Sequence, residues 1–383
     1  MSKIELKEVC KKLYPEENDD RIPFSRFSAL MAHLYIGKKA KEYFNEKNKS
    51  SSFSLKNINL LIPDGKTMVI LGPSGCGKTT LLKLIAGLSR PDSGNIFYDD
   101  INMLGVPPKD RKIGIIFQDY ALYPHFTSKR NIISYFFFKK KSPELDKEAR
   151  EKFQKTSELM GVDIEYLLGR KPTNLSGGEK QRISLARCIT REPKLFLMDE
   201  PFSNLDQKLR EKYRFKLKML LNHFKITSVY VTHDQKEAVI LADVLAIMNH
   251  GIIEQVGTVE SIYNNPKNIF IAEFLNLSDD VPAINIIDGA ILSEELKSKK
   301  IGIRPEEIDF SLNKKDNFIP CSVKEFYHIS VKRITVMCLL LHNENVYTTI
   351  PLNDKIKAED QIWIKFKKYL IFDKTSGERI QGE

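Results

Sequence analysis

A glycine-rich stretch between a buried strand and a helix constrains the fold of this chain more than any other feature. Residues 72–80 are Gly-Pro-Ser-Gly-Cys-Gly-Lys-Thr-Thr and match the pattern G-x-x-x-x-G-K-[ST]. The apolar run at 68–71 predicts a buried strand before this loop, and the run at 81–86 predicts a helix that ends near Gly87. A strand, a glycine loop and a helix in this order predict an α/β fold that binds the phosphates of a nucleotide.

The residues of this loop are suited to binding phosphate groups and a cation. Glycines allow the backbone N–H groups to point at the β- and γ-phosphates, and the N-terminus of the helix adds a partial positive charge. Lys78 supplies a full positive charge, and the hydroxyl of Thr79 is expected to bind Mg²⁺. The predicted nucleotide-binding residues of the loop are Pro73, Ser74, Gly75, Cys76, Gly77, Lys78, Thr79 and Thr80.

A second apolar run, at residues 195–198, ends in the acidic pair Asp199 and Glu200. This pattern predicts a buried parallel strand with carboxylates at its C-terminal edge, where α/β sheets bind ligands. Asp199 is expected to hold Mg²⁺ through a water molecule, and Glu200 to polarise the attacking water as a general base. An acidic pair after a strand can instead cap a helix. The neighbouring motifs favour the catalytic interpretation.

With these two motifs and the stretch Leu-Ser-Gly-Gly-Glu-Lys-Gln at residues 175–181, the chain resembles the ATP-binding subunits of ABC transporters. The matches run in order from about residue 55 to 275. The resemblance implies an α/β P-loop ATPase that binds ATP and Mg²⁺ and sandwiches two ATP molecules in a head-to-tail dimer. Gln118 matches the glutamine that senses Mg²⁺ and the attacking water. His233 matches the switch histidine that contacts the γ-phosphate.

The Ser-Gly-Gly stretch is implied to contact the ATP that a second copy of the chain holds. Ser176 can cap the following helix, whose N-terminus would then point at the γ-phosphate beside Lys78 of that copy. The family usually has Gln where this chain has Glu179, which places a carboxylate near a phosphate. The resemblance adds to the predicted nucleotide-binding residues Ser176, Gly177, Gly178, Glu179 and, from the loop that crosses the dimer interface, Asp206. It also implies Glu200, His233 and Gln118 as catalytic residues, and Thr79, Gln118 and Asp199 as metal ligands.

Adenine is stacked on an aromatic residue near the N-terminus in this family, and Tyr14 is the natural match. An atypical insertion, at about 16–52, separates Tyr14 from the next strand. Its apolar residues follow the spacing of an amphipathic helix: Phe27, Leu30, Met31 and Leu34. The favoured interpretation is an extra helix packed on its own domain. Docking to a partner or to the membrane surface, and partial disorder, are the alternatives.

Composition limits the class of protein. No stretch reaches the ~18–20 apolar residues that span a bilayer, and the N-terminus lacks the apolar segment of a secretory signal. A membrane role is therefore expected through partners. The net charge of +10 is spread along the chain and is expected to be a solvated surface, with attraction to anionic lipid as the alternative. The five scattered cysteines predict reduced thiols and no metal site.

The expected organisation is a nucleotide-binding domain at 1–258 with a helical subdomain at about 119–192, a helical linker at 259–280, and an all-β domain at 281–383. The patterns also predict a helix at 207–224, a hairpin at 244–254, and short strands after residue 300 that suggest a small barrel. This last part resembles the OB-type regulatory domain of importer ATPases. Residues 302–308 and 372–380 are most similar to the carbohydrate branch, the maltose and glycerol-phosphate importers.

The resemblance implies a peripheral subunit at the cytoplasmic face of the cell membrane that drives solute uptake. Its expected partners are a second copy, two integral membrane permease subunits that contact the helical subdomain and, indirectly, an extracytoplasmic solute-binding protein. No nucleic acid is expected. A carbohydrate is the favoured cargo, with polyamine, ferric iron or an oxyanion as alternatives. A soluble ABC ATPase acting on nucleic acid is disfavoured, because the chain has one cassette and no long coiled coil between Lys78 and Asp199.

Overall fold

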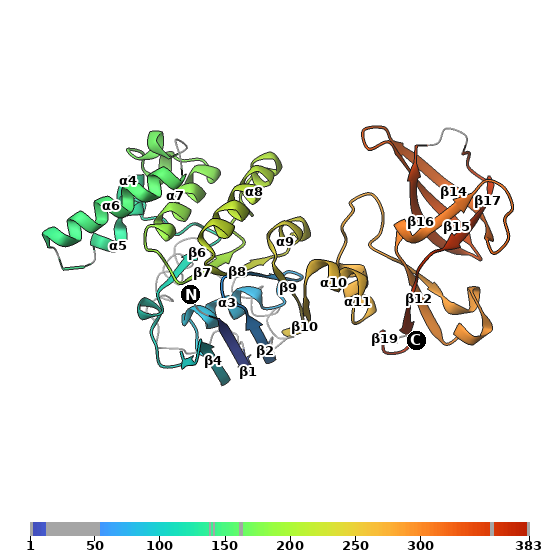
Figure 1. Ribbon diagram of the computed structural model, residues 1–383, viewed down its shortest axis with the longest axis horizontal. Helices are drawn as coiled ribbons and strands as arrows, with labels where there is room; N and C mark the ends of the chain where they lie inside the picture. The colour runs from blue at the N-terminus through green and yellow to red at the C-terminus, as the bar shows by residue number, and fades with distance from the viewer. Residues whose placement is uncertain are drawn as a thin grey trace, which may run out of the picture. The chain divides into compact units, whose positions relative to one another are not determined.

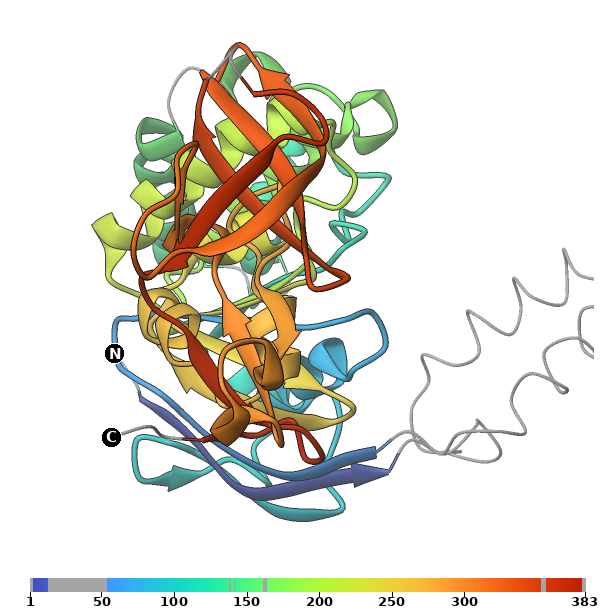
Figure 2. The same cartoon turned by 90° about the vertical axis from the view of Figure 1, so that its right-hand side faces the viewer.

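The computed structural model describes residues 3–12, 54–137, 139–140, 142–160, 164–352 and 356–380. The chain divides into two compact units, the first formed by residues 1–233 and 248–253 and the second by residues 234–247 and 254–383. Figures 1 and 2 show the two units from two sides. Tyr14 and the insertion predicted at about 16–52 lie outside the described residues. The domain boundaries at 258 and 280 stay predictions.

A mainly parallel sheet with the strand order β10-β9-β3-β8-β7-β6 carries the glycine-rich loop. Strands β3 (Thr67–Leu71), β7 (Leu195–Asp199) and β8 (Thr227–Thr232) are buried along their whole length, as expected for parallel strands covered on both faces. They pair in parallel in the order β3-β8-β7, followed by β6 (Ile113–Ile116). The strands predicted before the glycine loop and before the acidic pair are confirmed.

Strands β9 (Val244–Asn249) and β10 (Ile252–Gly257) are neighbours in this sheet, and the predicted hairpin is confirmed. The turn between them contains His250 and Gly251, both with positive φ values, 42° and 81°. Two successive left-handed residues are typical of tight hairpin turns.

A second, antiparallel sheet has the strand order β2-β1-β4-β5. Strand β1 (Ile4–Lys12) lies between β2 (Ser54–Ile62) and β4 (Ser93–Tyr98), and β5 (Ile101–Asn102) completes the edge. Figure 2 shows β1 and β2 running side by side over most of their length. One face of β1 and β2 is buried, which is the usual alternation of an antiparallel sheet packed on a core.

The helices of the first unit fall into two groups. Helices α3 (Lys78–Ala86) and α8 (Gln207–Phe224) follow β3 and β7, and the helix predicted at 207–224 is confirmed. The other helices, drawn in green in Figure 1, are α4 (Ser128–Ile132), α5 (Ser134–Phe137), α6 (Pro143–Met160) and α7 (Gly177–Ile189). Ile132, Ile164, Leu167 and Ile183 form a separate apolar core in this group.

The second unit begins with α9 (Gln235–Leu241), α10 (Val259–Asn264) and α11 (Ile269–Phe274). Among its described residues from Asn285 onward, the strands form two antiparallel sheets. The first has the order β11-β12-β18-β19, with the bounds Asn285–Asp288, Lys299–Ile303, Leu370–Asp373 and Arg379–Ile380. The second has the order β13-β17-β14-β15-β16, with the bounds Ile308–Ser311, Gln361–Phe366, Ile319–Ile329, Ile334–Leu341 and Glu344–Pro351.

One apolar core joins the two sheets of the second unit, with Ile287 and Ile303 from the first and Val323 and Leu339 from the second. The all-β character predicted for this part is confirmed, although its strands are divided between two sheets. Among the described residues, no helix combines the length and the apolar character needed to cross a membrane.

Candidate active site

The glycine-rich loop makes a tight turn between β3 and α3. Gly77 has a φ of 110° and forms the N-cap of α3, a conformation that residues with a Cβ atom rarely adopt. Gly72 is confined by close packing, since a Cβ atom there would lie 2.1 Å from the backbone oxygen of Met248. Ser74 and Gly75 are exposed at the tip of the loop, and Thr80 lies in the first turn of α3.

Lys78 is buried inside the curve of this loop, with 5% of its surface exposed. Its ammonium donates hydrogen bonds to the backbone oxygens of Gly72 at 2.9 Å and Pro73 at 3.0 Å. A buried charge needs such partners. The loop therefore holds a positive charge at its centre, where a phosphate would be placed by the predicted motif.

Cys76 is also buried, and burial raises the pKa of its thiol, against the opposing effect of the nearby Lys78. Its backbone oxygen accepts a hydrogen bond from the N–H of Gly251 at 3.1 Å. The thiol thus sits in the loop as a small, protonated, buried group.

Arg111 fixes the other end of α3, and nothing in the sequence motifs predicted this. Its guanidinium donates to the backbone oxygens of Ile85 at 2.8 Å, Met103 at 2.6 Å and Val106 at 2.9 Å. A cation at the C-terminal end of a helix also interacts favourably with the helix dipole. A Cβ atom at Gly87 would lie 2.4 Å from the guanidinium carbon, so the helix ends in a glycine beside it.

Thr79 and Asp199 meet at the C-terminal edge of the sheet. The Thr79 hydroxyl donates to Oδ1 of Asp199 at 2.9 Å, which places two oxygen ligands side by side. Asp199 is 8% exposed, and this burial raises the pKa of its carboxyl, although the hydrogen bond from Thr79 opposes the shift. A buried carboxylate beside a hydroxyl suits Mg²⁺, which prefers oxygen ligands. A bound cation would offset the unfavourable ionisation of Asp199.

Glu200 and His233 form a pair beside this edge. Nδ1 of His233 lies 3.0 Å from Oε1 of Glu200, at the ends of β8 and β7. Glu200 has a φ of 42°, and its N–H donates to the backbone oxygen of Val231 at 3.1 Å. A left-handed conformation at a residue other than glycine costs free energy and is concentrated at functional sites. The side chain of His233 remains half exposed.

Gln118 and Asp206 lie on the loops that follow β6 and β7. The backbone oxygen of Gln118 accepts a hydrogen bond from the side chain of Asn204 at 2.9 Å. Asp206 is the N-cap of α8 and accepts from the N–H of Leu209 at 3.0 Å. Among the described residues, no hydrogen bond joins the side chain of Gln118 to Thr79 or Asp199.

The Ser-Gly-Gly stretch begins α7 with a capping box. The hydroxyl of Ser176 accepts from the N–H of Glu179 at 3.3 Å, and Oε2 of Glu179 accepts from the N–H of Ser176 at 2.7 Å. This backbone hydrogen bond is the main cause that lowers the pKa of the Glu179 carboxyl, and Arg170, 3.7 Å away, adds to the effect. In the single chain, the Glu179 carboxylate is hydrogen-bonded to the N-terminus of its own helix. Its predicted position near a phosphate of a second copy stays a prediction.

The capping box could have been found from the sequence, because Ser-x-x-Glu before a helix is its known pattern. Gly177 and Gly178 lie between the two capping residues and pack against the loop and helix that follow Glu200: a Cβ atom at Gly177 would lie 3.0 Å from the backbone oxygen of Asn204. Ser176 is exposed. Within the described part of the single chain, no hydrogen bond joins this stretch to the glycine-rich loop.

Comparisons with known proteins agree on one family. The sequence model described as "ABC transporter" matches residues 55–203. The sn-glycerol-3-phosphate import ATP-binding protein UgpC of Psychromonas ingrahamii is 42% identical over 272 residues, which cover 67% of this chain and 70% of that protein. The trehalose/maltose import ATP-binding protein MalK of Thermococcus litoralis is 36% identical over 366 residues, covering 85% of this chain and 95% of that protein.

A solved structure of the same family has a similar fold. The dimeric structure of a bacterial ABC transporter cassette aligns with a TM-score of 0.51 and 28% sequence identity. The alignment covers 67% of this chain and 98% of that one.

Proposed function

Because the chain belongs to the ATP-binding subunits of ABC transporters, we propose that it hydrolyses ATP between two copies of itself and drives carbohydrate import through partner membrane subunits. The observation that carries this proposal is the hydrogen bond between Thr79 of the phosphate loop and Asp199 of the acidic strand. It joins two motifs that are distant in the sequence into one site for a nucleotide and its cation.

The loop residues bind the phosphates. Lys78 places its ammonium at the β- and γ-phosphates, exchanging the oxygens of Gly72 and Pro73 for phosphate oxygens. The N-terminus of α3 adds its partial positive charge. Thr79 and Asp199 would hold Mg²⁺, and Gln118 would be a third ligand. When bound, Mg²⁺ supplies positive charge that neutralises the charge developing on the phosphate oxygens.

Glu200 acts as the general base. Its carboxylate orients a water molecule toward the γ-phosphate and accepts a proton from it. His233 keeps the carboxylate in place through the 3.0 Å contact between Nδ1 and Oε1. The half-exposed imidazole of His233 has its other edge available to the γ-phosphate.

The other half of the site comes from the second copy. Ser176, Gly177 and Gly178 present the N-terminus of α7 to the γ-phosphate of the opposite chain, and Glu179 contributes by fixing that N-terminus through the capping box. Asp206 holds the loop that crosses the interface, and Tyr14 stacks on adenine. To shift the ratio of closed to open dimers from 1:99 to 99:1, ATP must bind the closed dimer about 5.5 kcal/mol more tightly than the open one. These contacts across the interface are the source of that difference.

The cargo is inferred from the relatives, whose names refer to import of glycerol 3-phosphate, trehalose and maltose. The chain is peripheral to the membrane and works with permease subunits. The helical group α4 to α7 contacts two of them, and an extracytoplasmic solute-binding protein delivers the cargo. Polyamine, ferric iron and oxyanions are less favoured, because the similarity to a sugar importer extends over 85% of the chain.

The test has two parts. The purified full chain is expected to release phosphate from ATP only with Mg²⁺, and the Lys78→Ala variant is expected to release none. Cells that lack the gene are expected to lose uptake of labelled maltose or glycerol 3-phosphate and to regain it with the wild-type gene but not with the Lys78→Ala gene. Loss of spermidine uptake alone would move the cargo to polyamine, and no ATP hydrolysis by the wild-type chain would refute the enzyme.

A further inference from the structure

The loop that follows β6 contains two successive residues in the left-handed conformation. Tyr120 has a φ of 63° and Ala121 has a φ of 45°. This conformation is costly for a residue with a Cβ atom, so it persists only where the surrounding structure holds it. Tyr120 is also buried. The turn that comes directly after Gln118 therefore needs specific contacts to keep its shape.

Those contacts come from α7. The guanidinium of Arg187 donates hydrogen bonds to the backbone oxygen of Ala121 at 2.7 Å and to that of Tyr120 at 2.9 Å. The hydroxyl of Ser184, one turn earlier on the same helix, donates to the backbone oxygen of Tyr120 at 3.2 Å. A guanidinium presents its N–H groups in a rigid, planar fork. A single side chain thus fixes two successive carbonyl groups relative to each other.

The backbone of Gln118 is held on its other side as well. Its oxygen accepts a hydrogen bond from the side chain of Asn204, in the loop after β7, at 2.9 Å. The side chain of Gln118 is exposed, so the direction in which it extends is set mainly by its backbone. That backbone is restrained by Asn204 at one point and, two residues further on, by the fork of Arg187.

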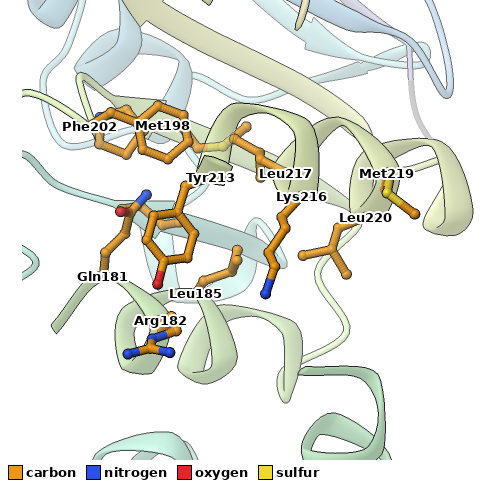
Figure 3. Close-up of a pocket in the computed structure, with 12 residues that line it drawn as sticks. Gln181, Arg182, Leu185, Met198, Phe202, Tyr213, Lys216, Leu217, Met219 and Leu220 are labelled. Atoms are coloured by element: carbon orange, nitrogen blue, oxygen red, sulfur yellow. The ribbon is translucent and has the colours of Figure 1, made fainter. Parts of the chain in front are cut away.

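Apolar packing supplies little of this restraint on one side of the loop. A cavity of about 280 Å³ lies between α7, α8 and the ends of β6 and β7, and Ile116, two residues before Gln118, is part of its wall. Figure 3 shows Leu185 of α7 and Leu217 of α8 at other walls of the cavity. Atoms that line a void lack some of their van der Waals contacts. The hydrogen bonds from α7 are therefore the firmer link between this helix and the loop.

We propose that Arg187 is a positioning residue for the Mg²⁺ site. Its fork holds the left-handed turn at Tyr120 and Ala121, and the turn sets the backbone from which Gln118 reaches the cation. This rests on the role that the proposed function gives to Gln118. Because Arg187 acts through the loop, its loss weakens binding of the cation and leaves binding of ATP without the cation unchanged.

The test measures the affinity of the full chain for adenylyl imidodiphosphate, a non-hydrolysable ATP analogue, by calorimetry in excess Mg²⁺ and in EDTA. The ratio of the two affinities is the gain from Mg²⁺. Arg187→Met is expected to reduce this gain about tenfold, the usual scale for a residue that orients a metal ligand. The affinity in EDTA should not change, because Lys78 and the glycine-rich loop remain. Equal losses in Mg²⁺ and in EDTA would indicate a merely structural role and overturn the proposal.

Arg191→Met is the matched control, because Arg191 follows the same helix and its guanidinium lies over the ring of Tyr135. It is expected to leave the gain from Mg²⁺ unchanged, and a reduction as large as that of Arg187→Met would refute a specific role of Arg187. Circular dichroism verifies folding of each variant. If Arg187→Met does not fold, Arg187→Lys replaces it, since lysine keeps the charge but lacks the fork. A wild-type gain in Arg187→Lys would then refute the proposal.

A double-mutant cycle shows whether Arg187 acts through Gln118. Gln118→Ala is expected to reduce the gain from Mg²⁺ by a similar factor, and adding Arg187→Met should reduce it no further, since both changes remove one contact. Additive losses would overturn the proposal. If Gln118→Ala leaves the gain unchanged, the metal ligand assigned under the proposed function is refuted, and the role of Arg187 with it. A loss in Gln118→Ala but not in Arg187→Met refutes the role of Arg187 alone.

The strained turn is tested by relieving its strain. Glycine adopts positive φ values without the cost of a Cβ atom, so Ala121→Gly lets the turn form without the fork. Adding Ala121→Gly to Arg187→Met is expected to restore part of the lost gain from Mg²⁺. A double variant that recovers none of it would refute the link between the left-handed turn and the cation.

Discussion

Two adjacent carboxylates, Asp199 and Glu200, have different partners at the end of one strand. Asp199 is buried against Thr79, whereas Glu200, whose side chain is 19% exposed, has a left-handed backbone and contacts His233. A strand alternates its side chains between the two faces of a sheet. The turn at Glu200 adds the change of direction that brings both carboxylates to the same edge, where we propose that Asp199 holds the cation and Glu200 orients the water.

Replacing Glu200 with Gln is expected to leave ATP binding intact and to reduce phosphate release by roughly 10²-fold or more, the usual contribution of a general base. The amide keeps the size of the side chain but cannot take a proton from water. An ATP-bound dimer should then accumulate, which size-exclusion chromatography with ATP can detect. Glu211→Gln, on the exposed face of α8, is the control. A monomeric Glu200→Gln variant that still hydrolyses ATP would contradict the assignment.

Replacing Asp199 with Asn is expected to abolish Mg²⁺-dependent hydrolysis while raising the melting temperature of the nucleotide-free chain. Burial raises the pKa of Asp199, so the folded chain is disfavoured when this carboxyl is ionised and gains stability as the pH falls through the raised pKa. Asn can still accept the hydrogen bond from Thr79 without carrying the charge. Thermal unfolding at several pH values checks this, and a lower melting temperature for the variant at neutral pH would be the opposite result.

At the scale of single residues, the motifs predicted which residues gather at the site better than they predicted the hydrogen bonds that individual side chains make. The residues Lys78, Thr79, Asp199, Glu200 and His233 come together as their spacing after strands suggests, because the ends of parallel strands share one edge. The part of Glu179 in the capping box was not predicted, although its Ser-x-x-Glu pattern was present in the sequence. The role of Arg111 had no local signal, since its partners are backbone oxygens from two separate segments, the end of α3 and the loop at 103–106.

At the scale of elements, the start of α7 depends on its capping box. Glu179→Ala is expected to destabilise the chain by about 0.5–1.5 kcal/mol, the usual net contribution of one hydrogen bond, because the Ser176 N–H loses its acceptor while the Ser176 hydroxyl still caps the helix. Glu179→Gln keeps an acceptor and should cost less. The pKa of Glu179 is lowered in the folded chain, so its contribution is present above the ordinary range of a carboxyl and is lost as the pH falls through the lowered value. Chemical denaturation at two pH values measures both effects, and equal stability of the Ala variant and the wild type at neutral pH would contradict them.

Helix α3 depends on a residue that lies beyond its own end. Arg111→Met is expected to destabilise the chain by roughly 2–4 kcal/mol, because it removes the hydrogen bonds of a buried guanidinium to the backbone oxygens of Ile85, Met103 and Val106. The glycine-rich loop precedes α3, so ATP binding should weaken as well. Arg90→Met is a matched control for removing a charge, because Arg90 is an exposed residue close to the same helix end. Urea unfolding and ATP titration provide the measurements, and an Arg111→Met chain as stable as the control would show that the anchor is dispensable.

At the scale of the whole molecule, the class of each part could be predicted, but the arrangement of its strands could not. The helix at Gln207–Phe224 was predicted with its observed bounds because its apolar residues repeat with a clear helical period. In the second unit, β12 pairs with β18 and β14 pairs with β17 across long segments of sequence. A pattern of alternating residues shows that a strand exists and which face is buried, but it carries no information on the distant partner.

The last expectation concerns an active site that one chain does not complete. In the proposed head-to-tail dimer, each site takes Lys78 from one copy and Ser176 from the other. Lys78→Ala and Ser176→Arg chains are each expected to be inactive alone. Mixed in equal amounts with free exchange, half of the dimers are mixed pairs, and each mixed pair has one intact site.

The mixture is therefore expected to recover at most about one quarter of the wild-type rate, provided that the sites work independently and the dimer has two-fold symmetry. Recovery well below that value, with mixed dimers demonstrated by differential tagging, would mean that one intact site cannot turn over without the other. Full activity of either variant alone would exclude a shared site. The matched control is a mixture of Lys78→Ala with Lys78→Ala,Ser176→Arg, in which no pair of chains can form an intact site and no recovery is expected.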